Sequence, residues 1–276
     1  MTMYYSNKDF EGLYDEGLTA LMRGDLASAE KLFKDALELN KESYLPYYQL
    51  GKCYLRQGEL KKAEEMFSQA VKIQPAHVPT LAELGFVYLL NGNVNKAREV
   101  FERSLVLRPN HGKSLIGVSA CEFTSGNWDS AYEWALKSVE LGGSHFMALF
   151  VLGKCAKVLG FIDKAEESFQ KAEELIEKSA EVSPEQPEVY YLRGEIALLQ
   201  GKYSKALDFF RETEKYISEE HRKYYFYHEA FDLTEVLVKQ AICLKQLNKN
   251  DESKKIAERI LQLSPENKFA KSIIEL

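Results

Sequence analysis

The chain has 276 residues, of which 45% are apolar and 28% charged, and its formal net charge is −6. This composition is typical of a soluble protein with a buried core, and the acidic balance argues against nucleic-acid binding through bulk electrostatics. The first twelve residues, MTMYYSNKDFEG, lack the basic and then apolar pattern of a signal peptide. The most apolar stretch, 146–161, is interrupted by Lys154 and Lys157 and is too short to cross a bilayer. We therefore expect a cytoplasmic protein without a membrane span.

The sequence repeats itself with a period of 34 residues. The stretch LGKCYLRQGELKKAEEMF at 50–67 returns as LGKCAKVLGFIDKAEESF at 152–169, with ten of eighteen positions identical. Each unit has a small residue, then a glycine, an alanine and an aromatic residue at fixed spacing. In the first five units these marks are Gly17, Gly51, Gly85, Ser119 and Gly153; Gly24, Gly58, Gly92, Gly126 and Gly160; Ala29, Ala63, Ala97, Ala131 and Ala165; and Phe33, Phe67, Phe101 and Phe169, with Ala135 breaking the aromatic series in the fourth unit. The frame continues at Gly194, Gly201, Ala206 and Phe210, and again at Ala241, Asn248, Ser253 and Ala257.

Each unit is predicted to form two amphipathic helices joined by a tight turn. Apolar residues recur at three- and four-residue steps on both sides of the second glycine, which ends the first helix where a left-handed residue is favoured. One helix pair cannot bury its apolar faces alone, so the pairs must stack. In chain order we expect one domain, 1–276, with repeats at about 10–43, 44–77, 78–111, 112–145, 146–186, 187–233 and 234–265 and a capping helix at 266–276.

The second unit resembles the tetratricopeptide repeat. Its residues occupy all eight signature positions of that family: Tyr47, Leu50, Gly51, Tyr54, Ala63, Phe67, Ala70 and Pro75. The resemblance covers roughly residues 10–265, and the fourth unit departs from it most. It implies an all-α fold, a right-handed α-solenoid of about seven helix-turn-helix repeats, with a concave surface lined by the first helix of each pair.

Two insertions interrupt the period of 34 residues. The first, near 170–186, adds seven residues and is predicted to lengthen a second helix by about two turns. The second, near 217–231, adds thirteen residues and is predicted to extend the first helix of the seventh unit backward.

The cysteines and histidines follow the repeat and do not indicate a metal site. Cys53, Cys121, Cys155 and Cys243 share one position, on the side of the first helix that faces its partner helix. Neighbouring repeats lie about 10 Å apart, whereas a disulfide needs Cα atoms within about 7 Å, so we expect buried structural thiols. His77, His111 and His145 recur at the turn between units, where a contact with the local backbone is expected.

The sequence contains no motif typical of an active site. NHGKS at 110–114 lacks the earlier glycine of a phosphate-binding loop, and HEAFD at 228–232 lacks the second histidine of a zinc-protease helix. We predict no catalytic residues, no metal and no cofactor, and thus a protein that is not an enzyme.

The family resemblance assigns a partner-binding groove to one face of each first helix. The stripe of groove positions is aromatic, apolar and basic, although packing between units would hide part of these side chains. The predicted groove residues are Tyr14, Tyr48, Lys52, Arg56, Phe86, Phe123, Phe150, Lys154, Lys157 and Tyr191. Exposed apolar stripes mark interaction sites, and lysines beside them favour an acidic peptide with apolar anchors.

The predicted function is a non-catalytic scaffold or adaptor that binds a peptide or partner protein in this groove. The chaperone-binding carboxylate clamp of some family members is predicted to be absent, because its asparagines are missing from the sixth and ninth positions. One alternative is a self-assembling structural protein, a homo-oligomer formed through its end faces or through residues 1–10. A second is a regulatory protein that binds nucleic acid or a small molecule, which rests only on HRKYYFY at 221–227.

Overall fold

Helix pairs follow one another along the chain, as the repeat marks predict. The computed structural model describes residues 9–142, 145–182, 186–217 and 222–275. The seven pairs are α1 Phe10–Met22 with α2 Leu26–Leu39, α3 Tyr44–Arg56 with α4 Leu60–Ile73, α5 Val78–Leu90 with α6 Val94–Leu107, α7 Gly112–Thr124 with α8 Trp128–Gly142, α9 Phe146–Val158 with α10 Ile162–Val182, α11 Pro187–Leu199 with α12 Tyr203–Tyr216, and α13 Leu233–Gln246 with α14 Asn250–Leu263. A last helix, α15 Lys268–Ile274, packs on α14. The predicted all-α solenoid of about seven repeats with a capping helix is confirmed.

The turn inside each pair depends on a residue in the left-handed conformation. Gly58 ends α3 with φ of 80°, and its N–H donates to the carbonyl of Leu55 at 3.1 Å. In the seventh repeat Asn248 takes the same conformation, with φ of 59°, as asparagine does at many helix ends. The same turn chemistry therefore sets the angle within both repeats.

An aromatic residue and a glycine lock five of the seven helix pairs together. The fourth and seventh pairs have other residues at these positions, Ser119 with Ala135 and Ala241 with Ala257. Phe67 of α4 is fully buried, and its ring lies over Gly51 of α3 so closely that an added Cβ would sit 2.6 Å from the ring. Gly85 and Phe101 repeat this arrangement in the third pair, also at 2.6 Å. Only a residue without a side chain lets the two helices approach this closely, which explains the strict spacing of these two marks.

The first insertion lengthens a helix, as predicted. Helix α10 has 21 residues, whereas the equivalent helix α4 has 14. The difference corresponds to about two turns at 3.6 residues per turn.

The second insertion forms a β-hairpin, and the prediction of a longer helix there was wrong. Strands β1 Tyr224–Phe226 and β2 Glu229–Phe231 pair in antiparallel fashion, with Tyr224 opposite Phe231. The helix that follows, α13, begins only at Leu233. Successive aromatic residues in this segment alternate between the two faces of the hairpin, as strands require. The hairpin packs on helices that are distant from it in the sequence.

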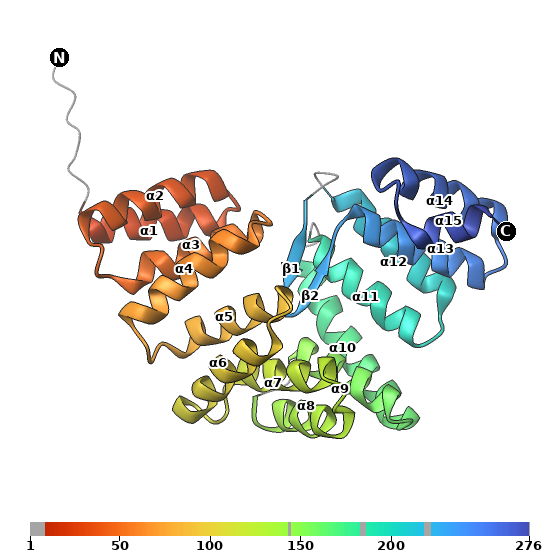
Figure 1. The fold of residues 1–276 in the computed structure, drawn as a ribbon, viewed down its shortest axis with the longest axis horizontal. Coiled ribbons are helices and arrows are strands. Elements are labelled where there is room, and N and C mark those ends of the chain that lie inside the picture. Colours follow the sequence, from red (N-terminus) through yellow and green to blue (C-terminus); the bar gives the residue numbers. More distant parts are fainter. Residues whose placement is uncertain (1–8, 143–144, 183–185, 218–221, 276) are drawn as a thin grey trace, which may run out of the picture.

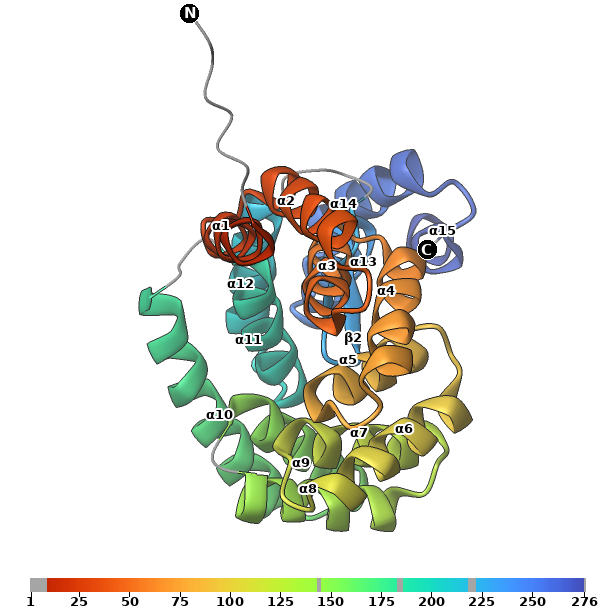
Figure 2. The same cartoon turned by 90° about the vertical axis from the view of Figure 1, so that its left-hand side faces the viewer.

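The helix pairs trace an arc, and the hairpin lies on the inner side of that arc between its two arms (Figure 1). Turned by 90°, the hairpin is again surrounded by helices from both halves of the chain (Figure 2). Strand β1 contacts α3 and strand β2 contacts α13. The insertion therefore reaches from the seventh repeat to the second, across the inner surface.

Candidate functional site

Helices α1 and α3 carry an aromatic and basic strip on the N-terminal part of the inner wall. The ring of Tyr48 lies 5.3 Å from the ring of His77, edge to face, and Lys52 Nζ lies 5.5 Å from the centre of the Tyr48 ring. Gln49 donates from Nε2 to the hydroxyl of Tyr14 at 3.1 Å. Tyr14, Tyr48 and Lys52 are half-buried, so each still presents part of its side chain.

Lys52 and Arg56 are the two cations of this strip. Burial lowers the pKa of Lys52, and the attraction of Glu83 only partly offsets that effect. Arg56 is exposed and donates from Nη1 to the carbonyl of Leu21 at 3.1 Å. Among the residues that the structure describes, neither cation forms an ion pair with a carboxylate. Both are therefore available to an acidic group.

The tip of the hairpin fills the middle of the inner wall. The Tyr227 ring packs edge to face on Phe86 of α5, with 5.2 Å between ring centres, and Lys113 Nζ lies 5.3 Å from the centre of the Tyr227 ring. The Tyr227 hydroxyl lies 3.2 Å from His145 Nε2. His145 Nδ1 accepts the N–H of Met147, so in the neutral ring Nε2 carries the proton and donates it to Tyr227.

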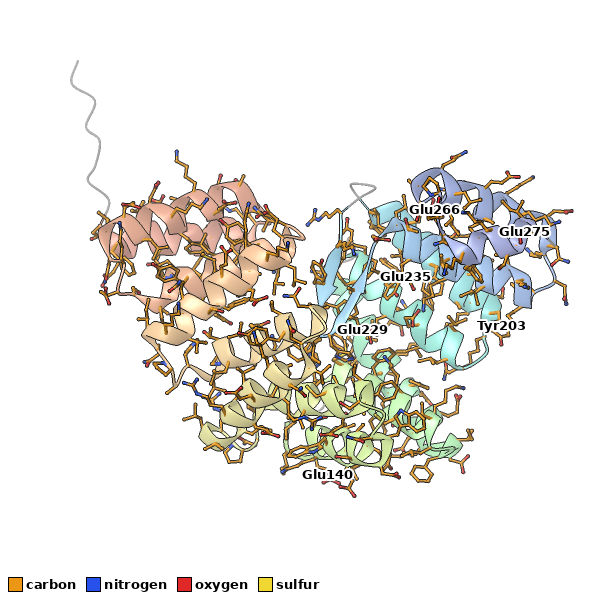
Figure 3. The ribbon with its side chains drawn as sticks, in the orientation of Figure 1. Glu140, Tyr203, Glu229, Glu235, Glu266 and Glu275 are labelled. Atoms are coloured by element: carbon orange, nitrogen blue, oxygen red, sulfur yellow. The ribbon has the colours of Figure 1, made fainter. Side chains whose placement is uncertain are left out.

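An ion pair anchors the second strand beside the tip. Lys154 Nζ of α9 lies 2.8 Å from Glu229 Oε1, and about a fifth of each side chain is exposed, 24% and 20%. The ammonium group also lies 5.5 Å from the Phe123 ring centre and 5.2 Å from that of Phe150. Burial raises the pKa of Glu229, but Lys154 and the neighbouring His228 lower it more, so that its net pKa lies below the usual value. Figure 3 shows Glu229 at the hairpin, on the inner side of the arc.

Aromatic stacking holds the base of the hairpin. The rings of Tyr191 on α11 and Phe231 on β2 are parallel, with centres 4.1 Å apart. The ring of Tyr224 on β1 also stacks on the Phe231 ring, with 5.2 Å between the ring centres. Offset stacks of this kind add about 0.5–1.5 kcal/mol beyond the area they bury. Side-chain contacts thus connect the hairpin to Phe86 on α5, to Lys154 on α9 and to Tyr191 on α11.

The structure divides the ten predicted groove residues into two groups. Tyr14, Tyr48, Lys52 and Arg56 remain partly or fully exposed near the N-terminus, and Lys157 is exposed on α9. Phe86, Phe150 and Tyr191 are buried, with 2%, 1% and 4% of their surface exposed. Phe123 and Lys154 are half-buried beneath the hairpin. The second group, which is buried or half-buried, therefore lies in or against the core that the hairpin completes.

Sequence reasoning missed the hairpin residues that cover the wall, Tyr227 and Glu229. One signal for them was present, since KYYFYHEAF contains four successive aromatic residues, a residue type favoured in strands, followed by two polar residues and then Ala230 and Phe231. The 34-residue frame had favoured helix at the same positions.

Four family models described as tetratricopeptide repeat match the chain, at residues 20–85, 78–111, 163–217 and 235–267. Together they span more than half of its length. The chain belongs to the tetratricopeptide repeat family.

Solved structures with the same fold include several tetratricopeptide repeat proteins. A tetratricopeptide repeat protein from Parabacteroides merdae has 17% identity and a TM-score of 0.61, covering 96% of this chain and 97% of its own. A chain of the APC/C hetero-tetramer Cut9–Hcn1 has 17% identity and a TM-score of 0.67, covering 99% of this chain and 50% of its own. MamA from Desulfovibrio magneticus has 22% identity and a TM-score of 0.53, covering 62% of this chain and 96% of its own. A search of curated proteins found no significant match.

The cysteines of this tetratricopeptide repeat protein lie in its core. Cys53, Cys121, Cys155 and Cys243 are buried and unpaired. Burial raises the pKa of Cys53 and of Cys155 to about 11, so these thiols stay protonated at neutral pH and are poor nucleophiles. In the described parts of the chain, no group of three or more His, Cys, Asp or Glu side chains is arranged to hold a metal ion.

The histidines of the repeat stand at the N-terminal ends of first helices. His77 Nδ1 lies 2.6 Å from Thr80 Oγ1, and His111 Nδ1 lies 2.9 Å from Ser114 Oγ. His145 alone of the three accepts a backbone N–H, as predicted for all of them. These contacts hold the helix starts in place, and burial lowers the pKa of each histidine.

None of the helices in the described ranges combines the length and the apolar character needed to cross a membrane.

Proposed function

We propose that this protein is a non-catalytic interaction scaffold whose inner wall binds a peptide or a segment of a partner protein. The observation that carries the proposal is the partial or full exposure of Tyr14, Tyr48, Lys52 and Arg56, in contrast to the buried aromatic rings farther along the inner wall. Aromatic and basic side chains that can be desolvated together dominate many protein interfaces.

The charges of the wall support an acidic partner. Two other cations of the inner wall already have carboxylates, because Lys113 pairs with Glu83 at 2.5 Å and Lys154 pairs with Glu229. Acidic side chains of the protein thus occupy part of the inner wall in the way that we propose for acidic side chains of a partner beside Lys52 and Arg56. Such charge complementarity raises the association rate and selects among partners more than it raises affinity.

Nucleic-acid binding through residues 221–227 has weaker support, since His221 lies outside the described residues and the aromatic rings of the segment are already used. Tyr224 stacks on Phe231 and Tyr227 packs on Phe86. Single-stranded nucleic acid needs free ring faces on which bases stack. The self-assembly alternative invokes residues 1–10, of which 1–8 also lie outside the described residues.

The proposal is tested by affinity capture from cells that produce the protein. Tyr48→Ser combined with Lys52→Glu should remove the captured partner, because the change deletes an anchor and reverses a charge on the open wall. Lys61→Glu, an exposed change on α4, is the control for altered net charge. Phe150 is unsuitable for this test, because its loss would open a cavity in the core and cost about 3–5 kcal/mol. Equal capture of the same partners by the wild type and the double variant, with circular dichroism showing both folded, would refute the proposal.

A further inference from the structure

Two aromatic rings of the inner wall each lie between a ring of their own helix pair and a ring of the hairpin. Phe86 packs on the buried phenylalanine of its own pair, with 5.0 Å between ring centres, and on Tyr227 of the hairpin, at 5.2 Å. Tyr191 packs on the phenylalanine of its own pair at 5.8 Å and on Phe231 of the hairpin at 4.1 Å. The repeat thus supports one side of each ring, and the hairpin covers another.

The second and fifth repeats carry the same arrangement of a ring and a lysine. Lys52 Nζ lies 5.5 Å from the centre of the Tyr48 ring, and Lys154 Nζ lies 5.2 Å from the centre of the Phe150 ring. The two sets stand at identical places in the repeat, three periods of 34 residues apart. In the fifth repeat the carboxylate of Glu229 pairs with Lys154 at 2.8 Å. The hairpin therefore shows which chemical group fits a lysine and a ring so arranged.

Strand β2 presents a carboxylate and a ring to two neighbouring repeats. Glu229 and Phe231 are two residues apart, and alternate residues of a strand point to the same side. Glu229 pairs with Lys154 on α9, and Phe231 stacks on Tyr191 on α11. Residues two apart on a helix point in different directions. A partner segment that makes the same two contacts must therefore be extended, with a glutamate two residues before an aromatic residue.

The hairpin depends on the helices for its position. In the described part of the chain its sheet has two strands, and a two-stranded hairpin is at best marginally stable by itself. At its start the carbonyl oxygen of Lys223 lies so close to the turn after α3 that a Cβ on Gly58 would sit 2.9 Å from it. Because these contacts are local, the hairpin can open while the repeats stay folded.

The strip on α1 and α3 continues to the tip of the hairpin. Glu83 pairs with Lys113, whose ammonium group lies 5.3 Å from the centre of the Tyr227 ring. Glu83 also attracts Lys52 and so raises its pKa against the effect of burial. A segment bound along the strip thus reaches the wall that the hairpin covers.

We infer that the hairpin is a built-in ligand of the inner wall, and that an extended partner segment with a glutamate two residues before an aromatic residue displaces it from α9 and α11. The inference rests on the proposed function, because it names the segment that the wall binds and the contact that regulates access. The tether gives the hairpin an effective concentration of about millimolar, so a free segment with the same contacts competes poorly. A partner that also contacts the strip on α1 and α3 gains further contacts and replaces the hairpin.

The test uses the full chain and a fluorescein-labelled peptide with the sequence of residues 223–232, with binding followed by fluorescence anisotropy. Two kinds of variant loosen the hairpin without changing the wall beneath it. Tyr227→Ser with Glu229→Gln removes the contacts of the tip, and Gly58→Ala pushes on the backbone at Lys223. Each should bind the peptide at least about tenfold more tightly than the wild type does, because a larger fraction of the chain has the wall open.

Gly92→Ala is the matched control for Gly58→Ala. Both glycines end the first helix of a pair in the left-handed conformation, with φ of 75° and 80°, so an alanine is strained in a similar way at both. A Cβ on Gly92 meets no atom within 4 Å, so this variant should bind the peptide as weakly as the wild type does. Melting curves show whether each variant is folded.

Changes in the wall and in the peptide define the contact. In the Gly58→Ala chain, Lys154→Gln should weaken peptide binding at least about tenfold, because a neutral amide cannot form a charge-assisted hydrogen bond. Lys61→Gln, an exposed change on α4, should have no effect. Two altered peptides should also bind at least about tenfold more weakly. One has glutamine in place of its glutamate, and the other is scrambled so that no glutamate stands two residues before an aromatic residue.

Several results would overturn the inference. Equal binding of the peptide by the wild type, Gly58→Ala and Gly92→Ala would show that the hairpin does not compete for the wall. Equal binding of the scrambled peptide, or failure of both loosened chains to bind the original one, would exclude the proposed segment. Concentration-dependent dimers of Gly58→Ala in light scattering, absent from Gly92→Ala, would assign the wall to the hairpin of a second copy.

The wild type offers a second measurement that does not depend on the folding of any variant. Excess unlabelled peptide, added to the isotope-labelled chain, should speed amide hydrogen exchange of residues 224–231, because the displaced hairpin is open to water. Unchanged or slower exchange in the presence of bound peptide would overturn the inference.

The outcome separates this inference from the proposed function. If the loosened chains fail to bind the peptide while the Tyr48 and Lys52 double variant loses its captured partners, the hairpin is not a built-in ligand and the open strip remains. If the loosened chains bind the peptide through Lys154 but the double variant still captures its cellular partners, the wall beneath the hairpin stands and the strip is excluded.

Discussion

Removing the Glu229 carboxylate should release the hairpin from the inner wall. Glu229→Gln leaves the shape of the side chain almost unchanged but leaves Lys154 with a neutral partner. Exposed ion pairs contribute about 0–1 kcal/mol, whereas breaking a buried pair by removing one partner costs about 3–5 kcal/mol. With 24% and 20% of the two side chains exposed, the pair lies between these two limits, so we expect a loss of about 2 kcal/mol in the free energy of hairpin opening.

Amide hydrogen exchange of residues 224–231 is the suitable assay, because repeat arrays can open locally without global unfolding. A loss of about 2 kcal/mol corresponds to roughly 30-fold faster exchange. The double variant Lys154→Met with Glu229→Gln should exchange more slowly than the sum of the two single effects predicts, since it leaves no buried charge without a partner. The difference is the coupling energy of the pair.

The matched control is an exposed pair on another helix. Lys62 and Glu59 lie 2.5 Å apart with 53% and 41% of their side chains exposed, and Glu59→Gln should change exchange in the hairpin less than twofold. Wild-type exchange in Glu229→Gln, or strictly additive effects of the two changes, would show that the hairpin is not held by this pair.

Two further changes test the packing of the repeats and the response of the hairpin to pH. Gly51→Ala places a Cβ 2.6 Å from the Phe67 ring, so thermal unfolding should show a loss of about 1–3 kcal/mol in the free energy of unfolding. A second change, Phe67→Leu, should partly restore this stability. An unchanged melting temperature in Gly51→Ala would contradict this packing. Burial lowers the pKa of His228 to about 4, below the usual value of about 6.5. Because the unfolded chain therefore binds the proton at a higher pH than the folded protein does, the free energy of unfolding should fall by about 3 kcal/mol as the pH falls from 7 to 4. His228→Gln should flatten this dependence in urea unfolding at the two pH values, and identical pH profiles for both proteins would exclude the histidine as its source.

The repeat architecture could be predicted from the sequence because its determinants are local. A glycine in the left-handed conformation, such as Gly58, ends a helix whatever lies elsewhere in the chain. The contact of Gly51 with Phe67 likewise joins two helices of one repeat, and it recurs at a fixed spacing. A pattern that local needs no knowledge of the tertiary structure, so the helix pairs and the longer helix α10 followed directly.

The hairpin could not be placed in the same way because its partners are distant in the sequence. Tyr227 contacts Phe86 and His145, and Glu229 contacts Lys154, all on helices of earlier repeats. Period and propensity describe a segment by itself, whereas this segment is ordered by a surface that exists only after five repeats have stacked. For the same reason, helix periodicity predicts the helix face on which Phe86 and Lys154 lie, but it does not predict that the hairpin covers this face.

A hairpin of this kind changes what a solenoid can do. In an ordinary array each repeat contacts only its neighbours, so the two ends of the arc are free to move relative to each other. Here β1 contacts α3 and β2 contacts α13, which adds a cross-connection between the second and seventh repeats. A cavity of about 810 Å³ beside the hairpin has walls from both arms, so its shape depends on that connection.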